Sequence, residues 1–128
     1  MRFNASSQVP AGQHLVSATL RFSTTSDSFA GSADPQQTVA MAGDWSEATT
    51  TYNNRPQTSS TLLGTLAGPT APNASYSISL DAAAISAALA GDINFSMQSA
   101  GTDNMWFFSR EATAVKRPAL VLNFEPNP

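Results

Sequence analysis

The chain has 128 residues, a length that fits one domain built around a single hydrophobic core. Charged residues make up only 12% and the net charge is −3, so the chain lacks the clustered lysine and arginine that nucleic acids and anionic membrane surfaces require. The absence of cysteine excludes a disulfide scaffold, a thiolate metal site and a cysteine nucleophile.

Alternation of apolar and polar residues predicts a series of short strands separated by turns. In residues 14–23, Val16, Ala18, Leu20 and Phe22 fall on one face and polar residues fall on the other. Further strands are expected at 1–5, 37–43, 61–68, 75–80, 93–98, 104–111 and 118–124. Short strands at this spacing indicate an all-β, antiparallel β-sandwich of jelly-roll type.

Residues 81–91 have a different pattern, which predicts one short helix over about 81–90. Asp81 is a suitable N-cap, Ile85 and Leu89 lie one turn apart, and Gly91 can end the helix. A helix this short is marginal alone, so we expect Ile85 and Leu89 to dock it on the sandwich. We expect residues 1–125 to form a single domain, with 126–128 as a tail or the start of a linker.

Motifs for catalysis are sparse, and we expect the protein not to be an enzyme. His14 is the only histidine, and no nucleophile elbow or glycine-rich phosphate loop is present. Asp44, Glu47 and Glu111 leave open a carboxylate pair for glycoside hydrolysis. However, Glu47 and Glu111 lie near arginines in the sequence, which favours ion pairs over a carboxylic acid of raised pKa.

Three aspartates leave a calcium site open as an alternative to the absence of any cofactor. Asp27, Asp34 and Asp103 carry oxygen ligands of the type that calcium binds, although their spacing is not that of an EF-hand. Aspartate is also a common turn residue, and all three lie in predicted turns.

The aromatic residues support two interpretations. Trp45 and Trp106 are expected to fill the core between the sheets, whereas Tyr52 stands next to the turn formed by 53–56. In a sugar-binding module, such rings would instead stack on the apolar faces of pyranoses, with planar polar groups bonding the hydroxyls.

Two stretches resemble the bacterial DNRLRE domain, also classed as carbohydrate-binding module family 96. The first is GDWSEATTTYNNRP at 43–56, and the second is TDNMWFFSREATAVKRPALVLNF at 102–124. The opening stretch, MRFNASSQVPAGQHLVSATLRF, also looks like the family's pattern, so the resemblance extends over about residues 1–124. Tyr52 stands where the family usually has tryptophan.

The resemblance implies a non-catalytic accessory module that binds polysaccharide, in some members acidic polymers such as alginate. It implies an extracellular or cell-surface location in a bacterium or archaeon. The few lysine and arginine residues and the absence of a long apolar run predict no contact with nucleic acid and no insertion into a membrane. No signal peptide is recognisable, so we expect either a cytosolic protein or a fragment or mature form. The residues we expect to bind the ligand are Tyr52, Asn53, Asn54, Arg21 and Lys116.

A motif shared across a family whose ligands vary is expected to specify the fold. We therefore expect an internal network, which would include charges that are buried and paired. Its members are Trp45, Glu47, Arg55, Arg110, Glu111 and Arg117.

One departure from the family suggests a second kind of function. The family normally has a further strand-bearing segment before the stretch that begins here at Met1. A sandwich without that strand would expose a sheet edge, which a neighbouring subunit could cover by donating a strand. The alternative is therefore a structural or adhesive module, or a filament subunit assembled by strand donation.

Overall fold

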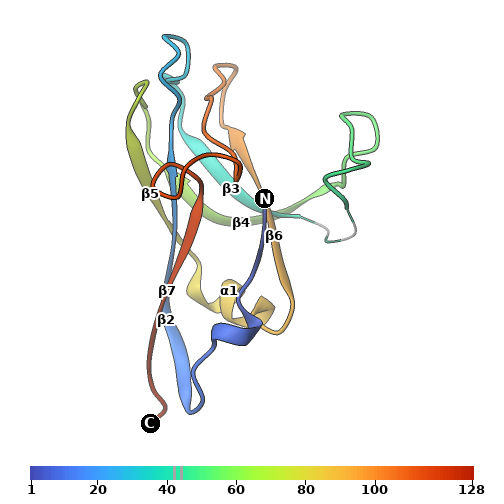
Figure 1. Cartoon of the computed structure of the whole chain (residues 1–128), viewed down its shortest axis with the longest axis vertical. Coiled ribbons are helices and arrows are strands. Elements are labelled where there is room, and N and C mark those ends of the chain that lie inside the picture. The colour runs from blue at the N-terminus through green and yellow to red at the C-terminus, as the bar shows by residue number, and fades with distance from the viewer. Residues whose placement is uncertain (42, 44) are drawn as a thin grey trace.

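The computed structural model describes residues 1–41, 43 and 45–128, and it is an all-β sandwich with one short helix (Figure 1). Two antiparallel sheets face each other, one ordered β1-β6-β3-β4 and the other β5-β2-β7. The predicted fold class is thereby confirmed. The elements are β1 (Arg2–Asn4), a 3-10 helix (Ser6–Gln8), β2 (Gln13–Ser23), β3 (Gln36–Met41), β4 (Thr58–Leu66), β5 (Ser75–Leu80), α1 (Ala82–Ala88), β6 (Asp92–Ser99) and β7 (Ala119–Pro126).

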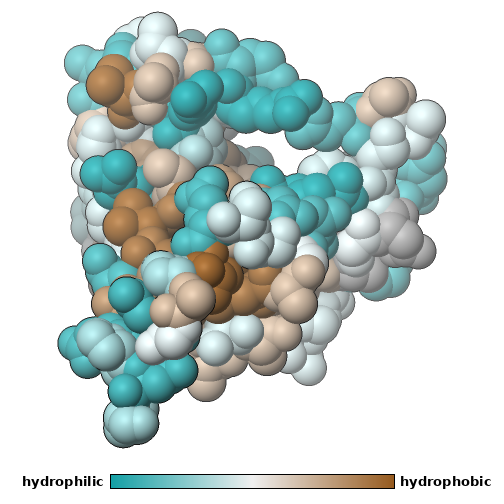
Figure 2. Space-filling model, turned by 60° about the horizontal axis from the view of Figure 1, so that its bottom comes forward, coloured by the Kyte–Doolittle hydropathy of each residue, from teal (hydrophilic) through white to brown (hydrophobic). Residues whose placement is uncertain are grey.

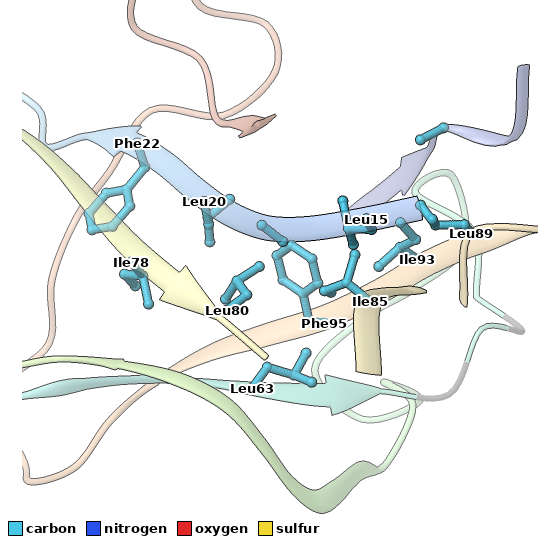
Figure 3. Packing of buried hydrophobic residues seen from close by; sticks show 12 residues of the cluster. Leu15, Leu20, Phe22, Leu63, Ile78, Leu80, Ile85, Leu89, Ile93 and Phe95 are labelled. Carbon is cyan, nitrogen blue, oxygen red and sulfur yellow. The ribbon is translucent and has the colours of Figure 1, made fainter. Parts of the chain in front are cut away.

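The core lies between the inner faces of the two sheets. Leu20 and Ile78 reach it from the three-stranded sheet and Phe95 reaches it from the four-stranded sheet, all essentially inaccessible to solvent (Figure 3). Phe3 stacks on Phe95 with the ring centroids 5.6 Å apart. Because side chains alternate along a strand, filling this layer with apolar residues sends their neighbours to the outer faces.

The alternation predicted for 14–23 holds for most of β2 but not for its start. The register of β2 against β7 shifts between Leu15 and Ser17, which indicates a β-bulge. As a result Leu15 is buried and Val16 is exposed, so the prediction that Val16 faces the core is wrong. A bulge inserts one unpaired residue and thereby exchanges the faces on its two sides.

The helix forms where it was expected and closes one end of the sandwich. Asp81 Oδ1 accepts hydrogen bonds from the backbone N–H groups of Ala83 and Ala84 at 3.0 and 3.2 Å. Ile85 and Leu89 are buried in the core cluster, where they dock α1 as predicted.

The strand predicted at 104–111 does not form. The segment is mostly irregular, with a single antiparallel bridge between Phe107 and Thr24. Phe107 turns inward and packs edge-on against Phe22, with ring centroids 5.6 Å apart. The aromatic residues of this segment predicted a strand, but only Phe107 forms a bridge and turns inward, and its neighbours belong to a loop.

The two lateral sides of the sandwich differ. On the side of β4 and β5 the two sheets are in direct backbone contact. The backbone N–H of Asp81, which follows β5, donates a hydrogen bond to the carbonyl of Leu63 on β4 at 2.7 Å. Gly64 permits this approach, since a Cβ atom there would stand 2.4 Å from the carbonyl oxygen of Ser79. On the opposite side, where β1 and β7 are the outermost strands, an apolar hollow separates the sheets.

We predict that Gly64→Ala lowers the free energy of unfolding by about 1–3 kcal/mol, because the added methyl group overpacks a contact between two backbones. Gly91→Ala is the matched control, since no atom lies within 4 Å of a Cβ there, and its effect should stay within about 0.5 kcal/mol. Urea denaturation of both variants measures the difference. Equal stability of the two would show that the sheets do not need this close approach.

Candidate functional site

The outer face of the three-stranded sheet carries hydroxyl groups and an arginine. Arg21 on β2 stands opposite Ser77 on β5 in the sheet register, and Ser23 stands opposite Ser75. The Oγ atoms of Ser23 and Ser75 lie 2.8 Å apart and share a hydrogen bond. The buried neighbours Leu20 and Phe22 fix this orientation, because each holds the adjacent residue on the outer face.

Residues just before β7 fold over this face and convert it into a cleft. The arginine cleft is an open hollow of about 390 Å³, and its main side chains belong to Arg21, Ser75, Ser77, Val115 and Arg117. None of the described residues that line it is acidic. A second hollow adjoins it, shares Ser75 and Val115 with it, and is lined by Lys116.

The cations of this region are available to a ligand. Among the described residues, the carboxylates form ion pairs with Arg2 and Arg110, but with neither Arg21 nor Arg117. The Lys116 ammonium lies 5.2 Å from the centre of the Phe108 ring, a cation–π geometry. Positive charge therefore collects at one place on a protein whose net charge is negative.

The other residues expected to bind ligand lie elsewhere, on the segment 45–57 that projects from the body of the sandwich (Figure 1). Tyr52 is exposed, and one face of its ring is covered by the Arg55 guanidinium at 3.8 Å. Asn54 accepts a hydrogen bond from the backbone N–H of Thr51 and donates one to the Thr49 carbonyl, so its amide fixes the loop.

Asn53 is exposed beside Tyr52, and no residue of this segment lines the arginine cleft. The structure therefore separates the predicted ligand-binding set into two groups. Tyr52, Asn53 and Asn54 form one group, and Arg21 and Lys116 form the other.

Trp45 lies at the edge of the four-stranded sheet and not between the sheets. Its Nε1 donates to Asn94 Oδ1 at 2.8 Å, and the Arg2 guanidinium lies 4.4 Å from the centre of a Trp45 ring. Arg2 also donates to the carbonyls of Gly43 and Trp45. Arg2, Gly43 and Trp45 line an open, polar hollow of about 540 Å³. Asn54 and Asp92 also line it.

The predicted ion-pair network forms in part, but on the surface. Arg110 Nη2 lies 2.7 Å from Glu47 Oε2, and Arg110 Nε lies 3.3 Å from Glu111 Oε1. The three side chains are 53 to 72% exposed, so the expectation of an internal network is wrong. The charged side chains lie outside because apolar side chains fill the space between the sheets. Arg55 and Arg117 take no part in these ion pairs.

Glu111 is held in its ionised form. The Ser109 hydroxyl donates to Glu111 Oε2 at 2.6 Å, and this hydrogen bond lowers the pKa of the carboxyl group, with a smaller contribution from Arg110.

The pKa of the Met1 amino group is lowered, mainly because the group is partly buried. There it donates a hydrogen bond to the Phe95 carbonyl at 2.7 Å.

The three aspartates considered for calcium fix loops. Asp103 Oδ2 accepts a hydrogen bond from Ala33 N–H, Asp34 Oδ2 accepts one from Asp103 N–H, and Asp27 Oδ1 accepts one from Phe29 N–H. Within residues 1–41, 43 and 45–128, no three histidine or acidic side chains gather as a metal site would require.

An apolar hollow opens between β1 and β7. We name it the edge groove; it has a volume of about 320 Å³ and is lined mainly by Phe3, Ala5, Leu120, Leu122 and Phe124. Figure 2 shows apolar residues gathered in the recessed middle of this face, with polar residues along its rim. A second hollow of similar volume shares Phe3 and continues past Trp45 and Pro118.

Two aromatic residues in the connections between strands are exposed. Phe29 is 77% exposed and Trp106 is 52% exposed, so the prediction that Trp106 fills the core is wrong. Phe107 packs against the core cluster, and adjacent residues of an extended segment point in opposite directions, so Trp106 faces solvent; the sequence alone does not tell which of the two rings turns inward.

The model of carbohydrate-binding module family 96 matches residues 1–124. The chain belongs to carbohydrate-binding module family 96. No curated protein sequence matches it. The family identity makes the exposed hydroxyl, arginine and aromatic groups candidates for contact with sugars. In the described part of this family 96 module, no helix is long and apolar enough to cross a membrane.

We predict that Glu47→Gln changes the free energy of unfolding of this family 96 module by less than about 1 kcal/mol, because exposed ion pairs contribute little to stability. Phe95→Ala, which empties the centre of the core, should cost about 3–5 kcal/mol in the same urea titration. A loss of several kcal/mol in Glu47→Gln would instead indicate a buried charge network.

Proposed function

We propose that the protein is a non-catalytic, extracellular module that binds polysaccharide in the arginine cleft. The observation that carries the proposal is the juxtaposition of Arg21 and Arg117 with the hydroxyls of Ser75 and Ser77, with no acidic side chain among the described residues of the lining. Guanidinium groups bind carboxylates with two parallel hydrogen bonds, and serine hydroxyls can donate to and accept from sugar hydroxyls. The ligand that fits best is a polymer containing uronic acid.

The size and setting of the cleft support this proposal. Its volume of about 390 Å³ lies in the range of small-ligand sites, and its open form suits a chain that passes through. Its floor comes from β2 and β5 of one sheet, which is more rigid than a loop would be, and residues 114–117 of the connection before β7 form the remaining wall. Lys116 in the adjoining hollow can contact a neighbouring acidic unit of the polymer.

A non-catalytic role is supported by the state of the carboxylates. Hydrolysis of a glycoside needs one carboxylic acid of raised pKa facing a second carboxylate. Glu47 and Glu111 instead share Arg110, and the pKa of Glu111 is lowered by the Ser109 hydroxyl and by that arginine. Asp44, the third candidate, lies outside the described residues.

We propose a location outside the cell or on its surface, in a bacterium or archaeon, because a polysaccharide-binding module must reach a polymer that lies outside the cell. Membership of a carbohydrate-binding family supports this location.

We predict that the double variant Arg21→Ala/Arg117→Ala binds alginate at least about tenfold more weakly than the wild type, since each charge-assisted hydrogen bond lost weakens binding by about that factor. Affinity electrophoresis and calorimetry measure the change. Arg55→Ala is the matched control, because it removes an exposed arginine on the Tyr52 segment. If Arg55→Ala loses affinity and the double variant does not, the ligand binds at Tyr52.

A second candidate function, assembly through β-strand pairing between copies, is favoured by the edge groove. β7 pairs only with β2 within the described part of the chain, so its other edge presents backbone groups without a strand partner. Beside that edge, Leu120, Leu122 and Phe124 face the apolar hollow. A strand from a second copy would hydrogen-bond to β7 and cover these side chains, as a structural or filament-forming module requires.

We predict, for this second function, that the wild type forms oligomers whose mass rises with concentration, whereas Leu122→Lys is monomeric, because a charge enters the groove. Val121→Lys is the matched control on the outer face of the same strand and should still assemble. Light scattering after gel filtration gives the masses, and circular dichroism checks that both variants fold. A wild-type monomer at every concentration would rule out assembly.

A further inference from the structure

We propose that Phe29 and Trp106 form a second sugar-binding site, specific for uncharged pyranose units, at the loop end of the sandwich. The loop end comprises the connections 24–35, 67–74 and 100–106, which lie together beyond the same ends of the strands (Figure 1). The inference rests on the proposed polysaccharide-binding function, and it adds a site with a different chemical preference.

The two rings stand on neighbouring backbone segments. Trp106 N–H donates to the carbonyl of Ala30, the residue after Phe29, at 3.0 Å, and Thr25 N–H donates to the Trp106 carbonyl at 3.1 Å. Phe107 next to Trp106 packs on Phe22 in the core, which turns the indole of Trp106 towards solvent. Both aromatic side chains thus remain largely in water although a buried aromatic ring would stabilise the fold.

The backbone that carries these rings is held firmly. Ser32 and Thr70 exchange backbone hydrogen bonds at 3.2 and 2.7 Å, which join two of the three connections. Gly31 fits against this pair only because it has no side chain, since a Cβ atom would stand 2.5 Å from the Thr70 carbonyl oxygen. Asp103 joins the third connection through its bond to Ala33 N–H at 2.7 Å. A backbone fixed in this way loses little entropy when the rings that it carries bind a sugar.

The charge of the loop end selects the ligand. Its three connections contain Asp27, Asp34 and Asp103 but no lysine or arginine, so a uronate would meet only like charge. The apolar faces of neutral pyranose rings can stack on Phe29 and Trp106, and nearby carboxylate oxygens can accept hydrogen bonds from sugar hydroxyls. The loop end and the arginine cleft are therefore complementary to different units of a polysaccharide.

The test titrates the protein with neutral polymers, namely xylan, galactan and hydroxyethyl cellulose, and in parallel with alginate. Trp106→Ala and Phe29→Ala should each weaken binding of at least one neutral polymer about tenfold or more, as expected for exposed aromatic anchors. Their binding of alginate should be unchanged. Trp106→Phe should retain most of the neutral binding, and Leu62→Ala, which removes an exposed apolar side chain on β4, should have no effect on either.

Intrinsic fluorescence provides a second readout. A neutral polymer should shift the emission of the wild type, and in Trp106→Phe, where only Trp45 remains, the shift should disappear. If the protein binds alginate but no neutral polymer, or if Trp106→Ala and Phe29→Ala bind neutral polymers like the wild type, the second site is wrong and the proposed function stands. If the wild type binds no polymer at all, both are wrong.

Discussion

The contact between the inner faces of the two sheets is the constraint on which the rest of the domain depends. Leu20, Ile78 and Phe95 meet there, and they are among the largest fully buried side chains of the described residues. Since side chains alternate along every strand, this one layer also decides what the outer faces carry. The hydroxyl and arginine groups of β2 and β5 are exposed because their neighbours are in the core.

The same constraint explains how a net-negative chain presents a cationic cleft. The sequence has six basic residues. Arg2 and Arg110 are paired with carboxylates, and Arg55 lies on Tyr52. The remaining three, Arg21, Lys116 and Arg117, come together over one sheet face. Local concentration of charge, and not net charge, therefore governs what the cleft attracts.

The two lateral sides of the sandwich show how one core can be closed in one place and open in another. Gly64 lets β4 approach β5 until their backbones touch, which seals that side. On the other side β1 has three residues, and β7 has a strand neighbour on one edge only in the described part of the chain. The apolar surface that lines the edge groove is therefore covered on the core side and accessible from outside.

Much of this could be predicted from the amino-acid sequence, because it depends on local patterns. Period-two alternation predicts the strands and hence the sandwich, and the Asp81 cap with Ile85 and Leu89 predicts the helix. The motifs at 43–56 and 102–124 predict the family. Even the pairing of Arg110 with Glu47 and Glu111 follows from the motif, although its exposure does not.

Only the tertiary structure decided which side chains share a surface. A pattern along the chain cannot tell that Arg21 meets Arg117 while Tyr52 lies elsewhere, since these distances depend on how distant strands pair. The β-bulge at Leu15–Ser17 exchanged the faces of Leu15 and Val16, and the loop at 104–111 turned Trp106 to solvent. The sequence determined the fold through local periodicity and the family through its motifs. The sites depend on packing between segments far apart in the chain, which local periodicity does not encode.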